Sequence, residues 1–386
     1  MRKNVLMLTM LLFTASMSLS APMSALSAQS PTFARSSEEW ESLKDNKLEY
    51  SEIADLVHEY NPDVISNNYD YKSFVDTYGT TNEEISSEYR SKATELLNNI
   101  SGSDDATSVM SDAQAELQAK QLNQSADNNT DDSTTKSLSY AMSEAKIVMN
   151  AKSSFIAYYS ALTELESAKS RLESLKADET LTAAKAAAGT VTDKELRAVQ
   201  KSVSEQESAV KKAEEAIEET RQKLIVMLGW KSTDTPEIGE LPEVTAETVN
   251  AIDINSDLKK AADNNYTLKV NKRKLENASD TDNISVLKST IDSNERSIGV
   301  SVNSAYSSLK TALLNLETAQ LELSNAEKNM TLSEAGYSAG LISRYEYTTK
   351  QSELEEKKAA VTKAKCSLIS AYMTYESYVG GLADAG

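Results

Sequence analysis

The sequence has almost no residues for redox, metal or acid–base chemistry. Its 386 residues include one cysteine, Cys366, and one histidine, His58. A disulfide framework and a paired-cysteine metal site each need a second cysteine, so both are excluded. A catalytic thiol works with a partner histidine, and the context of His58 matches no such pair. With no glycine-rich phosphate loop either, we expect no enzymatic activity, no cofactor and no metal.

Proline and glycine are scarce, and their positions outline long helices. The five prolines are Pro22, Pro31, Pro62, Pro236 and Pro242. Residues 63–235 and 243–386 therefore contain none, and because proline breaks helices, both spans can be mostly helical. Between Gly102 and Gly229 the only glycine is Gly189.

The chain also has few aromatic residues and an excess of acidic ones. Aromatic residues make up 6%, hydrophobic residues 40% and charged residues 26%, and the mean hydropathy is −0.46. This composition is typical of a soluble helical rod rather than a membrane bundle. The net charge is −19. Such an acidic chain is a poor partner for nucleic acid or an anionic membrane surface.

The N-terminus has the features of a secretory signal peptide. Arg2 and Lys3 precede a largely apolar run from Val5 to Phe13, and small residues follow through Ala28. This order matches the three regions of an export signal. We expect residues 1–28 to be the signal peptide and the protein to be exported to the cell envelope.

The chain contains an internal duplication. A shift of 151 residues aligns Phe155–Gly229 with Tyr306–Gly380 without a gap. The aligned pairs are Leu162 with Leu313, Leu165 with Leu316, Ala168 with Ala319, Leu172 with Leu323, Leu181 with Leu332, Gly189 with Gly340, Gln200 with Gln351, Val210 with Val361, Ala213 with Ala364, and Gly229 with Gly380. One structural unit therefore occurs twice.

Each copy is predicted to be a helical hairpin. Gly189 and Gly340 can each end a helix in the left-handed region, and each is followed by a capping residue with glutamate three positions later. These capping pairs are Thr192 with Glu195, and Ser343 with Glu346.

The arms of each hairpin have coiled-coil spacing. Apolar residues recur at intervals of seven, as Val203, Val210, Ile217 and Leu224 in the first copy and Leu354, Val361, Leu368 and Tyr375 in the second. An arm of about 34 residues is roughly 50 Å long. A hairpin of two such arms is long and too narrow to enclose a globular core. Its remaining faces must meet other helices or water.

We divide the chain into five parts. After the signal peptide comes an N-terminal helical region with a polar insertion, residues 29–135. The first hairpin repeat is 136–230, the linker is 231–250, and the second leading helix with its hairpin repeat is 251–386. The two leading helices are predicted at Leu48–Tyr60 and Ile252–Asn264. Within the insertion, 101–105 and 125–135 are rich in Ser, Asp and Asn and are predicted to be loops.

The sequence resembles the TolC family of outer-membrane efflux proteins. The resemblance covers roughly residues 46–382. It is based on the helix that ends at Asn61-Pro62, the doubled hairpin with its Gly-Leu-Ile-Ser turn, Lys-Leu-x-x-Met-Leu-Gly at 223–229, and Glu-Ile-Gly-Glu-Leu-Pro at 237–242. It implies a homotrimer whose six hairpins form a hollow α-helical barrel. The barrel would work with a periplasmic adaptor (membrane fusion) protein and an inner-membrane transporter.

The resemblance also implies where the functional residues lie. The adaptor-contacting tips would be Gly189, Thr190 and Val191 in the first repeat and Gly340, Leu341 and Ile342 in the second. A gate or acidic ring would include Glu195, Tyr337 and Glu346. From the residues alone, both glutamates can equally be capping-box carboxylates, and Tyr337 can be a packing residue.

One departure from the family matters for the fold. Family members in an outer membrane insert a β-hairpin between the helices of each half, with alternating apolar residues over about ten positions. Neither 99–137 nor 277–304 alternates over that length, so β-barrel strands are not detected. Either the protein is a helical-only relative that lacks the β-hairpins, or its strands are too degenerate to recognise, and the first alternative is favoured. We therefore expect an all-α fold of duplicated long antiparallel coiled-coil hairpins that form an α-helical barrel on oligomerisation.

Three functions fit these observations. The first is a TolC-like efflux conduit, a trimeric helical tunnel that exports substrate across the cell envelope. It would lie in the outer membrane if the host has one, and otherwise in the cell wall or outside the cytoplasm. The second is an adaptor, which carries one hairpin between glycine-rich strands that are missing here. The third is a structural coiled-coil envelope protein without transport activity.

Overall fold

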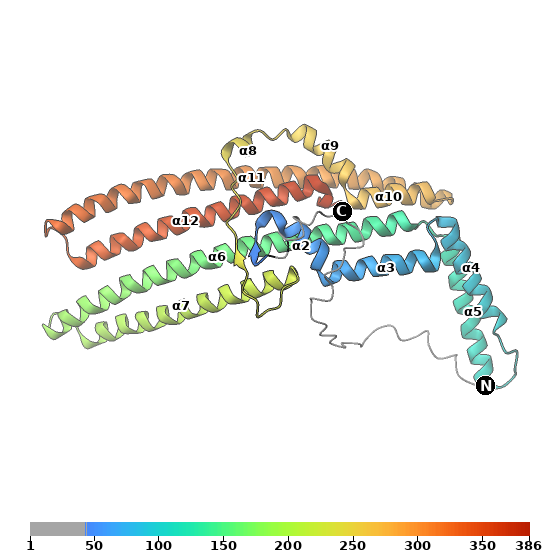
Figure 1. Ribbon diagram of the computed structural model, residues 1–386, viewed down its shortest axis with the longest axis horizontal. Coiled ribbons are helices and arrows are strands. Elements are labelled where there is room, and N and C mark those ends of the chain that lie inside the picture. The colour runs from blue at the N-terminus through green and yellow to red at the C-terminus, as the bar shows by residue number, and fades with distance from the viewer. Residues whose placement is uncertain (1–42, 44) are drawn as a thin grey trace. The chain divides into compact units, whose positions relative to one another are not determined.

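The computed structural model describes Leu43 and residues 45–386. The predicted signal peptide lies outside the described residues. Residues 46–386 form one unit that consists of two similar halves (Figure 1). Helices dominate, and the two described strands have two residues each. The expected all-α fold with duplicated long hairpins is confirmed for this part of the chain.

The first half begins with short elements and ends in a long helical hairpin. Its elements are β1 (Lys47–Leu48), the 3₁₀ helix η2 (Tyr50–Glu52), α2 (Ile53–Tyr60), α3 (Pro62–Tyr78), α4 (Asn82–Asn98), α5 (Ala106–Asp127), α6 (Ser133–Ala187) and α7 (Asp193–Met227). Helix α6 has 55 residues, which corresponds to about 80 Å. The predicted leading helix at Leu48–Tyr60 is shorter than expected, because Leu48 pairs in a strand and the α-helix starts at Ile53.

The second half repeats this plan with fewer elements. It contains β2 (Glu237–Ile238), α8 (Ala246–Asn250), α9 (Ile254–Asn264), α10 (Tyr266–Asn277), α11 (Thr281–Ser338), α12 (Arg344–Ser377) and the π-helix η3 (Tyr378–Leu382). Strand β2 pairs in parallel with β1, Lys47 opposite Glu237 and Leu48 opposite Ile238. The predicted second leading helix starts at Ile254 rather than at Ile252, because Asp253 is its N-cap residue.

The two halves differ most where each long helix begins. In the second half, a three-residue turn joins α10 to α11. In the first half, the helical hairpin α4–α5 stands between α3 and α6. The predicted loop at 125–135 is partly wrong, because 125–127 end α5 and 133–135 begin α6. Ala126 is buried in the last turn of α5, and Asp132 caps α6, so only 128–132 lie outside the helices.

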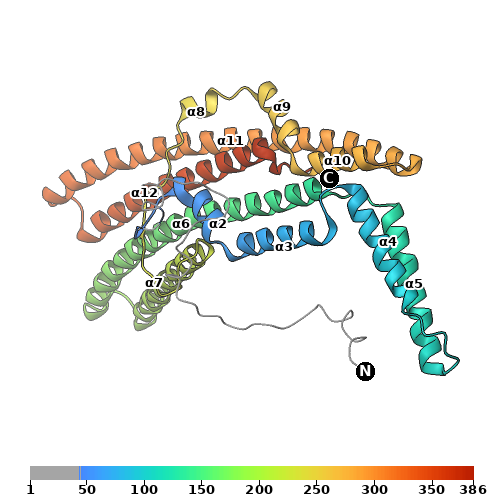
Figure 2. The ribbon, with the colours of Figure 1, turned by 45° about the vertical axis from the view of Figure 1, so that its right-hand side comes forward.

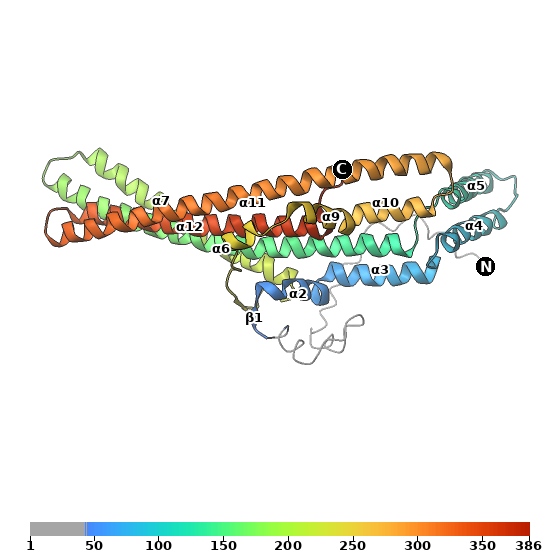
Figure 3. The ribbon, with the colours of Figure 1, turned by 90° about the horizontal axis from the view of Figure 1, so that it is seen from above.

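The four long helices pack in the order α7, α6, α12, α11. Helix α6 contacts both its own hairpin partner α7 and α12 of the other half, and α12 also contacts α11. Figure 3 shows α12 between α11 and α6. An ion pair between Lys363 and Glu164 (2.5 Å) and a hydrogen bond between the hydroxyls of Ser170 and Ser352 (3.3 Å) cross the α6–α12 contact. The two hairpins are therefore joined side by side within one chain.

A buried asparagine holds each half together. Asn61 caps α3, and its Nδ2 donates to the carbonyl of Met227 at the end of α7 (2.9 Å). Asn265 caps α10, and its Nδ2 donates to the carbonyl of Ala383 beyond α12 (2.8 Å). Both side chains are buried. Each ties the start of a half to the end of its hairpin, a link between residues more than 110 positions apart.

The ungapped alignment is off by one residue at the end of the second repeat. The sequence pairs Gly229 with Gly380, but the glycine with a positive φ is Gly381 (φ 121°), which corresponds to Gly229 (φ 93°). A Cβ at either glycine would clash with the residue before the buried asparagine, Tyr60 or Asn264. The π-helix η3 absorbs the additional residue, as π-helices do.

A buried carboxylate also joins the two halves. Asp132, which is 1% exposed, caps α6 and accepts a hydrogen bond from Nε of Arg273 on α10 (2.5 Å). Burial would raise the pKa of Asp132, but hydrogen bonds from the Thr135 amide, Asn277 and Arg273 outweigh it and lower the pKa. The folded state therefore favours the charged carboxylate.

We predict that Arg273→Ala lowers the free energy of unfolding by on the order of 2 kcal/mol at pH 7, because it removes a charged partner of a buried carboxylate. The contribution of Asp132 is fully present above its unfolded pKa of about 3.9 and is lost as pH falls through its lower folded value. The penalty should thus shrink below about pH 4. Urea unfolding at pH 7 and pH 3 measures this. Lys272→Ala is the control, since its pair with Glu295 is half-exposed on both sides; an equal loss in both variants would contradict the assignment.

Among the described helices, none is both long enough and apolar enough to cross a lipid bilayer.

Candidate functional site

The two hairpin turns are alike in backbone geometry. Gly189 and Gly340 have φ of 74° and 72°, and space around both is open. The amide of Thr190 donates to the carbonyl of Lys185 (2.9 Å), and that of Leu341 to the carbonyl of Gly336 (2.8 Å). These are Schellman motifs, which need a left-handed residue that glycine adopts without strain. Figures 1 and 2 show the two turns at the same end of the set of long helices.

A capping box follows each turn. The amide of Glu195 donates to the Thr192 hydroxyl (3.3 Å), and the Glu195 carboxylate accepts from the Thr192 amide (2.7 Å). Ser343 and Glu346 make the same pair of bonds (3.2 and 2.7 Å). The amide and hydroxyl of Thr192 lower the pKa of Glu195, and those of Ser343 lower the pKa of Glu346. Both glutamates are thus capping carboxylates and carry charge at neutral pH.

The turns differ in their side chains. Leu341 is 80% exposed at the second tip, where the first tip has Thr190. Val191 and Ile342 are half-buried at matching positions, and Ile342 lies against Gly336. The exposure of a leucine side chain to water is unfavourable. At a turn, such a side chain offers an apolar anchor to a partner.

Tyr337 packs within its own hairpin. Its ring stacks on that of Tyr347 with centroids 4.8 Å apart and planes at 19°. The side chain remains 41% exposed. Within one chain, the structure does not bring Tyr337, Glu195 and Glu346 into one cluster, since the first hairpin holds Glu195 and the second holds the other two.

The sole cysteine and the sole histidine lie in structural positions. Cys366 is buried with Ile156, Ile369 and Met373, and burial raises the pKa of its thiol. His58 is half-buried on α2, and its Nδ1 lies 2.6 Å from a carboxylate oxygen of Glu144 on α6. Among the described residues, no group of three or more His, Cys, Asp or Glu side chains could hold a metal ion.

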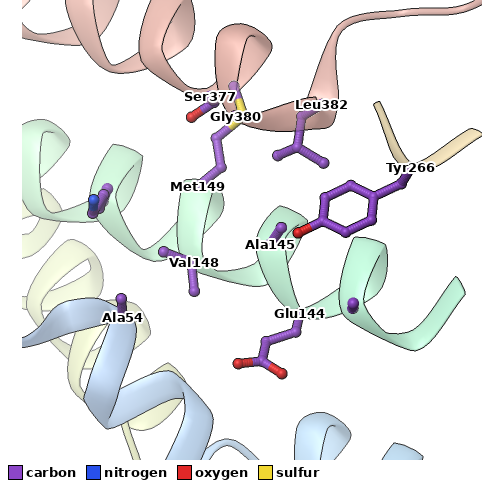
Figure 4. Close-up of a pocket in the computed structure, with 11 residues that line it drawn as sticks. Ala54, Glu144, Ala145, Val148, Met149, Tyr266, Ser377, Gly380 and Leu382 are labelled. Carbon is purple, nitrogen blue, oxygen red and sulfur yellow. The ribbon is translucent and has the colours of Figure 1, made fainter. Parts of the chain in front are cut away.

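A cavity of about 380 Å³ lies beside α6, where the two halves meet. Ala145, Val148 and Met149 of α6 line it together with Tyr266 and Leu382. Figure 4 shows Met149, Tyr266 and Leu382 on one side of α6, while the carboxylate of Glu144 points the other way, toward α2. The lining also includes Glu144 and Lys152 of α6, and the Glu144 carboxylate is paired with His58 on α2. The cavity is mainly a gap at the junction.

Sequence reasoning missed an exposed apolar stripe along α11. Five large apolar side chains on one side of the helix are each more than 60% exposed: Val286, Val300, Leu314, Leu321 and Leu332. The first four are spaced by multiples of seven, and 332 follows 321 by three turns, so all keep to one slowly turning side. The heptad spacing was visible, but exposure could not be read from the sequence because buried and free seams have the same period.

The matching side of α6 is covered. Leu314 corresponds to Thr163, which is 3% exposed, and Leu321 corresponds to Ser170, which bonds Ser352 of α12. The return helices show the opposite pattern, because the second copy, α12, is covered and the first copy, α7, is exposed. Ala359 and Cys366 of α12 are buried, whereas their counterparts on α7, Ser208 and Glu215, are exposed. One side of α11 and one side of α7 are therefore exposed. The equivalent sides of their duplicates, α6 and α12, are in contact with each other.

No protein-family model and no curated protein matches the sequence. Solved structures do match it in fold. The outer-membrane channel OprN aligns with a TM-score of 0.55 and 11% identity over 90% of this chain and 92% of that one. The outer-membrane protein VceC from Vibrio cholerae gives 0.52 and 9% over 87% and 97%. The MtrE outer-membrane channel of Neisseria gonorrhoeae in its open state gives 0.51 and 10% over 87% and 90%.

These identities are low, so the comparison concerns the fold. The similarity spans nearly the full length of both chains and includes both halves of the duplication. This chain therefore has the fold of the TolC-family outer-membrane channels, in a form whose described residues are almost entirely helical.

Proposed function

We propose that this protein is a TolC-like efflux conduit of the cell envelope. Three exported copies form a helical tunnel that receives substrate from an adaptor protein and an inner-membrane transporter. The protein acts as a passage and not as an enzyme. The fold it shares with outer-membrane channels supports this proposal.

The observation that carries the proposal is the pair of free sides on α11 and α7. Within one chain, α6 packs against α12 through sides whose duplicates remain exposed. A neighbouring copy can supply the same contact, with its α7 lying against α11. This contact is head-to-tail, and such contacts give a closed ring when the rotation between neighbouring copies closes. The duplication thus makes six equivalent hairpins from three chains.

In this ring, the tips are the adaptor-docking surface. Gly189, Thr190 and Val191 would alternate with Gly340, Leu341 and Ile342 around one end. The same closure would place Glu195, Tyr337 and Glu346 of all copies around the passage as an acidic ring or gate. The charge that their capping boxes stabilise supports this role.

The alternative is a structural coiled-coil protein of the envelope without transport activity. A spacer would typically be a parallel bundle of continuous helices and would not need two matched, capped turns at one end. The cavity beside α6 and the buried asparagines favour neither function.

The oligomer mass tests the proposal. We expect light scattering of the purified exported chain to give three times the monomer mass, and electron microscopy to show a hollow outline. A fully helical monomer, or a solid rod without a passage, would end the conduit proposal.

A further inference from the structure

Three side-chain pairs define how α6 and α12 meet within one chain. These in-chain pairs are Ser160 with Cys366, Glu164 with Lys363, and Ser170 with Ser352. The first is a hydrogen bond to the thiol, the second an ion pair (2.5 Å) and the third a bond between hydroxyls (3.3 Å). The numbers rise along α6 as they fall along α12, so the helices are antiparallel. The pairs therefore fix one register.

The duplication carries this register onto α11 and α7. The alignment of 155–229 with 306–380 has no gap, so each residue is as far from its turn as its counterpart is. A shift of 151 positions takes α6 to α11 and α7 to α12. The aligned pairs are Thr311 with Glu215, Asn315 with Lys212, and Leu321 with Lys201. All six side chains are exposed in the single chain.

Two of the aligned pairs can form hydrogen bonds. The Lys212 ammonium can donate to the amide oxygen of Asn315, and the Thr311 hydroxyl can donate to the Glu215 carboxylate. Both partners on α11 are uncharged, so neither pair brings like charges together. Because Glu215 stands where α12 has the buried Cys366, a contact built from these pairs is more polar than the one within a chain.

The third aligned pair is apolar on the α11 side. The Lys201 ammonium lies 3.5 Å from a carboxylate oxygen of Glu205 on its own helix. Its aliphatic stem remains to cover Leu321, as lysine stems commonly do on apolar side chains. Leu314 lies between the aligned pairs, and its counterpart Thr163 is 3% exposed at the α6–α12 contact. The same register would thus cover both exposed leucines.

From the ungapped duplication and the chemistry of these pairs, we infer that α7 and α11 of neighbouring copies meet in the antiparallel register of α6 and α12. Lys201, Lys212 and Glu215 are then the α7 residues that recognise a second copy of the chain. This inference rests on the proposed ring and identifies the residues that meet in it.

Disulfide cross-linking tests the register in the full-length protein. In a Cys366→Ala background, Lys201→Cys with Leu321→Cys should give covalent dimers and trimers on a non-reducing denaturing gel after mild oxidation. Glu215→Cys with Thr311→Cys should do the same. Both in-chain counterparts are contacts between short side chains, so the introduced cysteines should be close enough for a disulfide. Each single variant should stay monomeric on the gel.

Two controls match this design. Ser170→Cys with Ser352→Cys should form a disulfide within one chain, with loss of free thiols and no covalent dimer. Lys194→Cys with Leu321→Cys should not cross-link. Lys194 is also an exposed lysine on α7, but it lies one heptad, about 10 Å, from Lys201 along the helix. Circular dichroism checks that all variants remain helical.

The other outcomes are distinguishable. Particles of trimer mass that cross-link through the Lys194 variant, or through none of the pairs between copies, would overturn the register and leave the conduit proposal intact. Cross-linking by Leu321→Cys alone would show that α11 meets α11 of another copy, which overturns the head-to-tail contact as well. Particles of monomer mass would remove the ring itself, and with it both proposals.

Discussion

Replacing Leu314 and Leu321 together by serine should convert the assembled protein into monomers. Both side chains are exposed in the single chain and lie on the α11 side that a neighbour covers in the proposed ring. Burying one leucine contributes about 1.5–3 kcal/mol, so each interface loses at least about 3 kcal/mol. This weakens each contact by more than about a hundredfold. Light scattering across a dilution series measures the change.

Helicity should not change in this variant, since neither leucine contributes to the core of its own chain. Leu97→Ser is the matched control, because Leu97 is also exposed but lies on α4, outside the proposed α7–α11 contact. An unchanged oligomer mass for the double α11 variant would show that this side of α11 faces water or another partner. The interface proposal would then be wrong.

Replacing Gly189 and Gly340 together by valine should abolish efflux while the long helices remain. A side chain at positive φ costs on the order of 1 kcal/mol, and a β-branched one costs more. Space around both glycines is open, so the effect comes from the backbone alone. Each hairpin is held along its whole length by contacts between its helices, and the total loss of stability should be small.

The expected result is at least a tenfold loss of adaptor capture in a pull-down, and no export of a fluorescent substrate from cells. Gly102→Val is the matched control, because Gly102 also has a positive φ (63°) and open space but lies in the α4–α5 loop. If the double variant still captures adaptor and exports normally, the turns have a purely structural role.

The hairpins themselves could be predicted from short stretches of sequence. The glycines at 189 and 340, the capping residues Thr192 and Ser343, and the absence of proline act within one or two turns of helix. The heptads along α7 and α12 likewise depend on nearest neighbours on one helix face. These signals need no tertiary partner, and the structure shows each of them where the sequence indicates it.

The α4–α5 hairpin and the register shift could not be predicted in this way. Residues 82–127 lack strand alternation, but their weak helical pattern becomes a hairpin only because α4 and α5 cover each other. The one-residue shift at Gly381 is set by Asn264, whose carbonyl leaves no room for a Cβ, and Asn264 lies far away in sequence. Neither constraint is visible in a local window.

The sequence by itself determined the helices, their turns and the duplication, because backbone preference and side-chain periodicity are local properties. The tertiary structure alone decided which side of each long helix is covered. Leu314 and Thr163 occupy equivalent positions on duplicated helices, yet one is exposed and the other buried. The reason is physical: α6 has α12 beside it in the same chain, whereas the corresponding side of α11 has no long helix of its own chain beside it.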